Sequence, residues 1–177
     1  MIVTKRLILR DWRDEDRGPW AAMCADPRVM DTIGPLQSRA QADAGVDRYI
    51  GYARDHGFTI WATEHRADGR FLGLCGLKPG APGTPLEGAV EIGWRLAADV
   101  WGLGFAREGA QASLAWAWER LPCSHIGAIT GTRNARSRGL MSRLGMVHDP
   151  MLDFKHPTLA ADDPLQSHVT YWAERPQ

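Results

Sequence analysis

Cysteine is scarce in this sequence of 177 residues, and the scarcity narrows the class of protein. The three cysteines, Cys24, Cys75 and Cys123, are widely spaced and lie among apolar neighbours. An odd, scattered set of this kind argues against a disulfide framework and against a CxxC metal site. We therefore expect no metal and a reducing, cytoplasmic location.

The chain also lacks an excess of either charge and any long apolar run. Lys plus Arg number 21 and Asp plus Glu number 21, so the formal net charge is zero. Without a run of like charge, we expect no nucleic-acid partner. No window reaches the ~18 apolar residues of a membrane span and the N-terminus lacks a long apolar signal region, so we expect no membrane partner either. The length fits one domain over residues 1–177 with a substantial core.

The most informative stretch is residues 90–110, where a predicted strand leads through a glycine-rich turn into a long helix. Gly102 and Gly104 flank Leu103 just before the predicted helix start at Phe105. Glycine lets a ligand approach the backbone closely, and the first N–H groups of a helix are unpaired and carry the positive end of its dipole. The turn therefore predicts a phosphate or pyrophosphate site. A lone Gly-x-Gly is also common in plain turns, so the prediction depends on the strand predicted before it and the helix predicted after it.

Periodicity and turn residues predict the remaining elements. Ser38 and Gln41 form a capping-box pair before one helix, and Gly57 ends that helix. Strands are predicted at 4–11, 58–65, 70–77, 90–96, 124–131, 146–154 and 168–173, with the first at an edge of the sheet. Helices are predicted at 14–26, 39–56, 105–121 and 134–144. The fold class is α/β, with a mixed, mostly antiparallel sheet of about seven strands and about four helices.

Several motifs, in this order, resemble those of the GNAT acetyltransferase superfamily. Glu-Ile-Gly-Trp-x-Leu at 91–96, followed by Trp-Gly-x-Gly-Phe-Ala at 101–106, resembles the cofactor motif of that superfamily. Asn-x-x-Ser at 134–137 resembles a helix of its RimJ/RimL-like branch, and Thr-x-Arg-Leu-x-Leu-Arg at 4–10 resembles the first strand of that branch. The resemblance implies a single domain of GNAT-like fold, with acetyl-CoA as co-substrate.

The resemblance also implies which residues bind the cofactor. The turn would grip the pyrophosphate, Asn134 would reach the pantetheine, and the exposed backbone of residues 94–96 would act like a neighbouring strand, with a free N–H polarising the thioester carbonyl. The implied residues are Trp94, Arg95, Leu96, Trp101, Gly102, Leu103, Gly104, Phe105, Ala106, Arg107, Asn134 and Ser137.

Acyl transfer to an amine requires a base, and Glu91 is the leading candidate. It is the one acid in an apolar strand, where a buried carboxyl would have a raised pKa. The alternative is a solvated glutamate with no catalytic role. His156 and His168, which bracket the late loop, are alternative bases or ordinary loop histidines, and a water molecule could relay the proton to any of the three.

Ser137 is the candidate proton donor to the departing thiolate. It lies one turn into a predicted helix, on the face that Asn134 occupies. The alternative is a first-turn hydroxyl that bonds a backbone N–H. Tyr171, in the last strand, is not at the position where other members of the superfamily carry a tyrosine. A covalent route through Cys75 or Cys123 is disfavoured because neither has an adjacent base or helix start.

The expected function is therefore acetyl-CoA-dependent N-acetylation of a primary amine, on a protein N-terminus or a small molecule, by direct transfer in a ternary complex. Two alternatives are an aminoglycoside or amino-acid acetyltransferase and an acyl-CoA sensor without turnover. The acceptor pocket is expected from residues 30–39, 79–87 and 154–166, because early helices and late loops build it. The sequence leaves the oligomeric state open, although the apolar C-terminal strand could pair across a homodimer.

Overall fold

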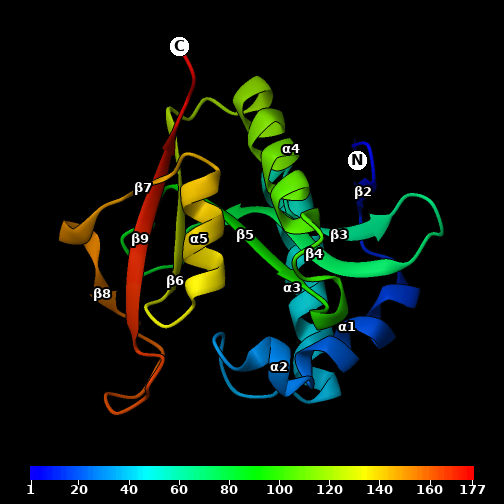
Figure 1. Cartoon of the computed structure of the whole chain (residues 1–177), viewed down its shortest axis with the longest axis horizontal. Helices are drawn as coiled ribbons and strands as arrows, with labels where there is room; N and C mark the ends of the chain where they lie inside the picture. Colours follow the sequence, from blue (N-terminus) through cyan, green and yellow to red (C-terminus); the bar gives the residue numbers. More distant parts are fainter.

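The structure is a computed structural model that describes every residue from Met1 to Gln177, and it contains a nine-stranded sheet with helices on both faces (Figure 1). The strands are β1 (Ile2–Val3), β2 (Leu7–Arg10), β3 (Ile60–His65), β4 (Phe71–Pro79), β5 (Val90–Leu96), β6 (His125–Gly131), β7 (Val147–His148), β8 (Phe154–Lys155) and β9 (Ser167–Glu174). The α-helices are α1 (Arg17–Cys24), α2 (Pro27–Met30), α3 (Arg39–His56), α4 (Phe105–Arg120) and α5 (Ala135–Arg143). Short 3-10 helices are η1 (Asp14–Asp16), η2 (Ala98–Val100) and η3 (Pro150–Leu152).

The sheet is divided at its centre. Its order is β1-β2-β3-β4-β5-β6-β9-β7, with β8 also paired to β9. Every pair is antiparallel except β5 and β6, which are parallel, are connected through α4 and share one register pair, Glu91 with Gly127. Residues 92–96 of β5 therefore have no strand partner on the β6 side. The predicted mixed, mostly antiparallel sheet is confirmed.

Side chains that alternate along the central strands pack into two separate hydrophobic cores, one on each face of the sheet. On one face, Trp61 of β3 belongs to a cluster with Leu114 of α4 and Met141 of α5. On the other, its neighbour Ile60 belongs to a cluster with residues of α1, α2 and α3, including Val46. Because successive side chains of a strand point to opposite faces, α4 and α5 cover one side and the first three helices the other. Any group that reaches the gap between β5 and β6 lies between these two layers.

Helix α3 begins and ends as predicted. The Gln41 N–H donates to Ser38 Oγ (3.3 Å), and the Ser38 N–H donates to Gln41 Oε1 (2.8 Å). Gly57, at the other end, has a φ of 74° and closes the helix in the left-handed region. Both end signals are local, which is why the sequence alone was sufficient here.

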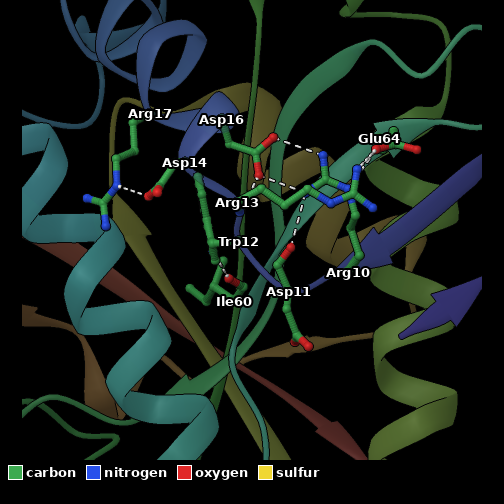
Figure 2. A network of polar contacts seen from close by, with 9 residues as sticks. All are labelled: Arg10, Asp11, Trp12, Arg13, Asp14, Asp16, Arg17, Ile60 and Glu64. Atoms are coloured by element: carbon green, nitrogen blue, oxygen red, sulfur yellow. Dashed lines mark hydrogen bonds and ion pairs between the residues drawn. The ribbon is translucent and has the colours of Figure 1, made fainter.

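The predicted first helix is divided by a buried ion cluster, which Figure 2 shows. The Arg10 guanidinium donates to both oxygens of Asp16 (2.7 and 2.9 Å) and, through Nε, to Glu64 (2.6 Å), and Arg10 is 6% exposed. Asp16 also accepts from the backbone N–H of Arg13 (2.8 Å), so η1 forms before α1. Asp16 therefore anchors the start of this helix to the sheet.

Three further features of the structure differ from the predictions. The strand predicted at 146–154 is wrong: it is divided into β7, η3 and β8, because Pro150 has no N–H to donate and Asp149 caps the turn after it. The first strand is shorter, since the Thr4 N–H and hydroxyl bond the Leu7 carbonyl and turn β1 back on β2, which places β1 rather than β2 at the edge. Helix α2 was not predicted. Two-residue strands and this extra helix raise the counts from about seven and four to nine and five.

Strand β9 lies inside the sheet. It pairs with β6 on one side and with β7 and β8 on the other, so most of its backbone is already hydrogen-bonded. It therefore offers little free edge for pairing across a dimer. None of the helices is both long and apolar enough to cross a membrane.

Candidate active site

The turn before α4 presents a row of unpaired N–H groups. Gly102 and Gly104 have φ values of 78° and 82°, the left-handed region that glycine adopts without strain. Gly104 is the N-cap of α4, and no side chain caps the helix there. No N–H group from Gly102 to Arg107 has a hydrogen-bond acceptor within the chain; the first that does, Glu108, bonds the Gly104 carbonyl. This is the geometry of an anion site at a helix start.

A polar clamp joins this turn to the N-terminal strands. The Glu108 carboxylate accepts from the Thr4 hydroxyl (2.6 Å), from the Arg6 backbone N–H (2.7 Å) and from Arg6 Nε (2.6 Å). Arg6 Nη1 donates to the Leu103 carbonyl (2.9 Å), and its guanidinium lies 4.5 Å from the ring centre of Phe105. The clamp therefore holds both the turn and the first residue of α4 in place.

Trp101 connects the turn to β5 and to α5. Its indole N–H donates to the Leu96 carbonyl at the end of β5 (2.9 Å). The Arg136 guanidinium, from the first turn of α5, lies 4.1 Å from its ring centre. A cation is thus held beside the unpaired N–H groups. Arg107 is exposed in the first turn of α4 and forms no ion pair.

Strand β5 separates its side chains between the two layers. Leu96 is buried in the core cluster between the sheet and α4, here called the α4 core, and Trp94 packs against that cluster. Glu91, Gly93 and Arg95 alternate with them and therefore face the α1 and α3 side. The contribution of residues 94–96 to a ligand in the gap is thus made mainly by their backbone.

Glu91 is buried and paired. It is 6% exposed, and it lies directly opposite Lys78 of β4, whose ammonium forms an ion pair with its carboxylate. Burial raises the pKa of Glu91, and the Lys78 charge opposes that rise without cancelling it. A carboxyl group of this kind can accept a proton closer to neutrality than an exposed glutamate can.

The two late histidines lie together near this pair. The rings of His156 and His168 are 4.8 Å apart between centres. Burial lowers the pKa of both; the Lys78 charge lowers that of His156 further, while the Gln166 carbonyl partly offsets the effect at His168. Both rings are therefore held towards the neutral form, in which an imidazole can act as a base.

Asn134 and Ser137 share the first turn of α5. Asn134 Oδ1 accepts from the Ser137 N–H (3.1 Å) and so caps the helix. The Ser137 hydroxyl, half-buried, has no hydrogen-bond partner within the chain, so it is not a first-turn group that satisfies a backbone N–H. It remains available to donate a proton.

The structure does not bring three other groups into the site. Tyr171 is 6% exposed and belongs to the α4 core, where it stacks on His148. Burial raises the pKa of Cys75 to about 12, which removes its thiolate at neutral pH. The Phe105 side chain is also in the core, so this residue can contact a ligand only through its N–H. No group of three or more His, Cys, Asp or Glu side chains is placed to hold a metal ion.

Four residues of the site were not found from the sequence. Lys78, Arg6, Glu108 and Arg136 reach it through contacts between elements far apart in the chain. Lys78 could have been inferred only from the register of β4 against β5. Arg6 lies in the motif at 4–10, but that motif predicts a strand and says nothing about a contact with the turn before α4.

Comparisons with known proteins agree with this geometry. The protein family described as "Acetyltransferase (GNAT) domain" matches residues 6–147. The chain is 28% identical over 146 residues to the uncharacterized protein YkkB of Bacillus subtilis (strain 168), covering 82% of this chain and 84% of that one. It is 25% identical over 154 residues to the uncharacterized N-acetyltransferase YoaA of the same organism, covering 86% and 85%.

Solved structures share the fold. An acetyltransferase from Agrobacterium tumefaciens str. C58 superposes with a TM-score of 0.79 at 23% identity, over 98% of this chain and 93% of that one. RimL, a ribosomal L7/L12 alpha-N-protein acetyltransferase solved with coenzyme A, gives 0.76 at 14% identity over 97% and 96%. A spermidine N-acetyltransferase from Vibrio cholerae, solved with CoA and spermine, gives 0.74 at 16% identity over 97% of both chains.

Proposed function

Since this chain belongs to the GNAT acetyltransferase family and is an acetyltransferase, we propose that it moves an acetyl group from acetyl-CoA to a primary amine by direct transfer in a ternary complex. The observation that carries the proposal is the row of unpaired N–H groups from Gly102 to Arg107 beside the gap between β5 and β6. An anion held at the turn would have its attached chain directed along the unpaired edge of β5.

The residues present fit coenzyme A. The N–H groups of the turn would hold its pyrophosphate, with Arg107 and Arg136 adding positive charge. The backbone of residues 94–96 would pair with the pantetheine, together with Asn134. When bound, acetyl-CoA supplies an acyl group activated as a thioester. A free N–H of β5 in this stretch would donate to the carbonyl oxygen as negative charge develops there.

Proton transfer would involve residues on both sides of the gap. Glu91 would accept a proton from the acceptor ammonium, directly or through water, with His156 or His168 as the alternative base. Lys78 would hold the Glu91 carboxylate in position through their ion pair. The unpartnered hydroxyl of Ser137 would give a proton to the departing thiolate.

For the acceptor, we propose a protein N-terminus or a small amine, within the RimJ/RimL-like branch. The Asn-x-x-Ser helix supports that branch, and the loops at 30–39, 79–87 and 154–166 would form the acceptor pocket. Three free cysteines support a cytoplasmic location for this single domain.

Titration calorimetry with acetyl-CoA, followed by a thiol-release assay on a panel of amines and N-terminal peptides, tests the proposal. We expect binding, and release with at least one acceptor class. Glu91→Gln should lower kcat on the order of 100-fold or more and leave the Kd for acetyl-CoA unchanged, because general-base assistance contributes about that factor. Glu119→Gln, which removes an exposed acid near the far end of α4, is the matched control. Binding without release for any acceptor would favour an acyl-CoA sensor instead.

A further inference from the structure

Arg95 projects from β5 on the side away from the α4 core, where it meets α1. It lies four residues after Glu91 on the same face of the strand, opposite Leu74 of β4. Its guanidinium carbon is 5.0 Å from the ring centre of Trp20, and its Nη1 is 3.5 Å from Cys24 Sγ. The Arg95 cation is therefore held over an aromatic ring on the α1 and α3 face of the sheet.

This half-buried cation has no anion within the chain. Arg95 forms no ion pair, and its polar neighbours are neutral because burial raises the pKa of both the Cys24 thiol and the Tyr49 hydroxyl. Arg10, the other arginine beneath these helices, is matched by two carboxylates. Removing a charge from water without a counter-ion is costly, so an arginine left unmatched in such a place is suited to an anion that arrives with a ligand.

No side chain separates Glu91 from Arg95 on this face of β5. The intervening residue on that face is Gly93, and a Cβ placed there would meet only Ile60 Cδ1, at an ordinary 3.5 Å. Packing within the protein therefore does not require glycine at this position. Glycine adds no side chain between Glu91 and Arg95, whose Cα atoms lie about 13 Å apart by the rise of a strand.

We infer that the acceptor is a small amino acid, whose amine lies towards Glu91 and whose carboxylate pairs with Arg95. The inference rests on the proposed function, and it selects one acceptor class within it. A guanidinium binds a carboxylate through two parallel hydrogen bonds, and the aromatic face of Trp20 holds that fork in a fixed plane. An acceptor that lacks the anion would leave Arg95 unmatched in the complex.

The experiment compares free L-amino acids with their amides, which keep the amine and lose the charge, at saturating acetyl-CoA. Wild-type protein should show kcat/KM for its best amino acid roughly 10- to 100-fold above that for the matching amide, the range expected for one charge-assisted pair. Arg95→Gln should abolish this preference by raising KM for the acid while KM for the amide stays the same. Arg95→Lys should restore part of it, because the charge is kept and the fork is lost.

The controls separate this inference from the proposed function. The Kd for acetyl-CoA and the melting temperature of Arg95→Gln should match wild type, and Arg48→Gln, which removes an exposed cation from α3, should keep the preference. Release with amides, polyamines or peptides but not with free amino acids would overturn the inference and leave the proposed function intact. A preference for the acid that persists in Arg95→Gln would also overturn it. Absence of release with every amine would contradict the proposed function itself.

Discussion

Helices α3 and α4 begin in opposite ways. At α3, Ser38 and Gln41 satisfy each other's backbone N–H groups, so the helix start is closed by its own side chains. At α4, the N-cap is Gly104, which has no side chain to offer, and the N–H groups before and after it are unpaired. One start is complete within the chain, and the other has the hydrogen-bonding capacity of a binding site.

The difference shows that the N–H groups at the start of α3 stabilise the fold, whereas those at the start of α4 are free to bind a ligand. The open start is not loose, because the Glu108 clamp and the Trp101 hydrogen bond fix it from both sides. Its N–H groups are therefore held in place before a ligand arrives, and binding orders little that was not already ordered. Three kinds of variant test this contrast. The first fills the uncapped start of α4, the second weakens the Glu108 clamp that supports it, and the third removes the cap of α3.

Closing the open start should have the largest effect. Gly104→Asp places a carboxylate where we propose that the pyrophosphate binds, at a φ of 82° and with a new Cβ about 3.4 Å from Arg6 Nη2. Like-charge repulsion should weaken acetyl-CoA binding by roughly 100-fold or more in calorimetry. The matched control is Ser38→Asp at the closed start, which should change neither affinity nor stability because the two residues cap equally well. Unchanged affinity in Gly104→Asp would contradict the assignment of the turn.

Loosening the support should have a smaller effect on the same affinity. Arg6→Ala removes the side-chain contacts of Arg6 with Glu108, Leu103 and Phe105, and it leaves the Arg6 backbone N–H bond to Glu108 and the N–H groups of the turn intact. We expect acetyl-CoA to bind roughly 10-fold more weakly, since misplacement of a preorganised site costs affinity without removing any ligand contact. Arg66→Ala, which loses only a long hydrogen bond to the Thr4 carbonyl, is the control. Equal affinity in the two variants would show that the clamp does not position the turn.

The clamp also predicts a dependence of stability on pH. Burial raises the pKa of Glu108, but hydrogen bonds from Thr4 and Arg6 outweigh it and hold that pKa below the ordinary 4.5. A carboxyl group with a lowered folded-state pKa stabilises the protein above its unfolded-state pKa, and this contribution is lost as the pH falls through the folded value. Chemical denaturation should therefore show the largest difference between wild type and Glu108→Gln at pH 6–7, and a shrinking difference below about 4.5. A difference that grows with acidity would contradict the clamp.

Opening the closed start should have the smallest effect and should leave binding alone. Ser38→Ala removes the cap of α3 and should lower the free energy of unfolding by about 1 kcal/mol. Denaturant unfolding measures this loss, and calorimetry should show an unchanged Kd for acetyl-CoA. A change in Kd would mean that the two helix starts are coupled.

The same contrast explains how much of the molecule could be predicted from its sequence. The start of α3 and the turn at Gly102 depend on residues at most three apart, and local patterns found both of them. Lys78 meets Glu91 through strand register, and Arg6 meets Glu108 across 102 residues, which no local pattern specifies. The strand predicted at 146–154 is interrupted because Pro150 has no N–H to donate and Asp149 caps the turn that follows it.

The shared register pair between β5 and β6 has a further consequence. The sheet is in effect two hydrogen-bonded ribbons, β1 to β5 and β6 to β9, that meet at Glu91 and Gly127. Their separation is therefore set less by backbone bonds than by the side chains of the core cluster that both ribbons share, which includes Leu114 of α4 and Met141 of α5. The width of the opening is thus a packing variable, and changes in core volume far from the reacting atoms can adjust it without altering either ribbon.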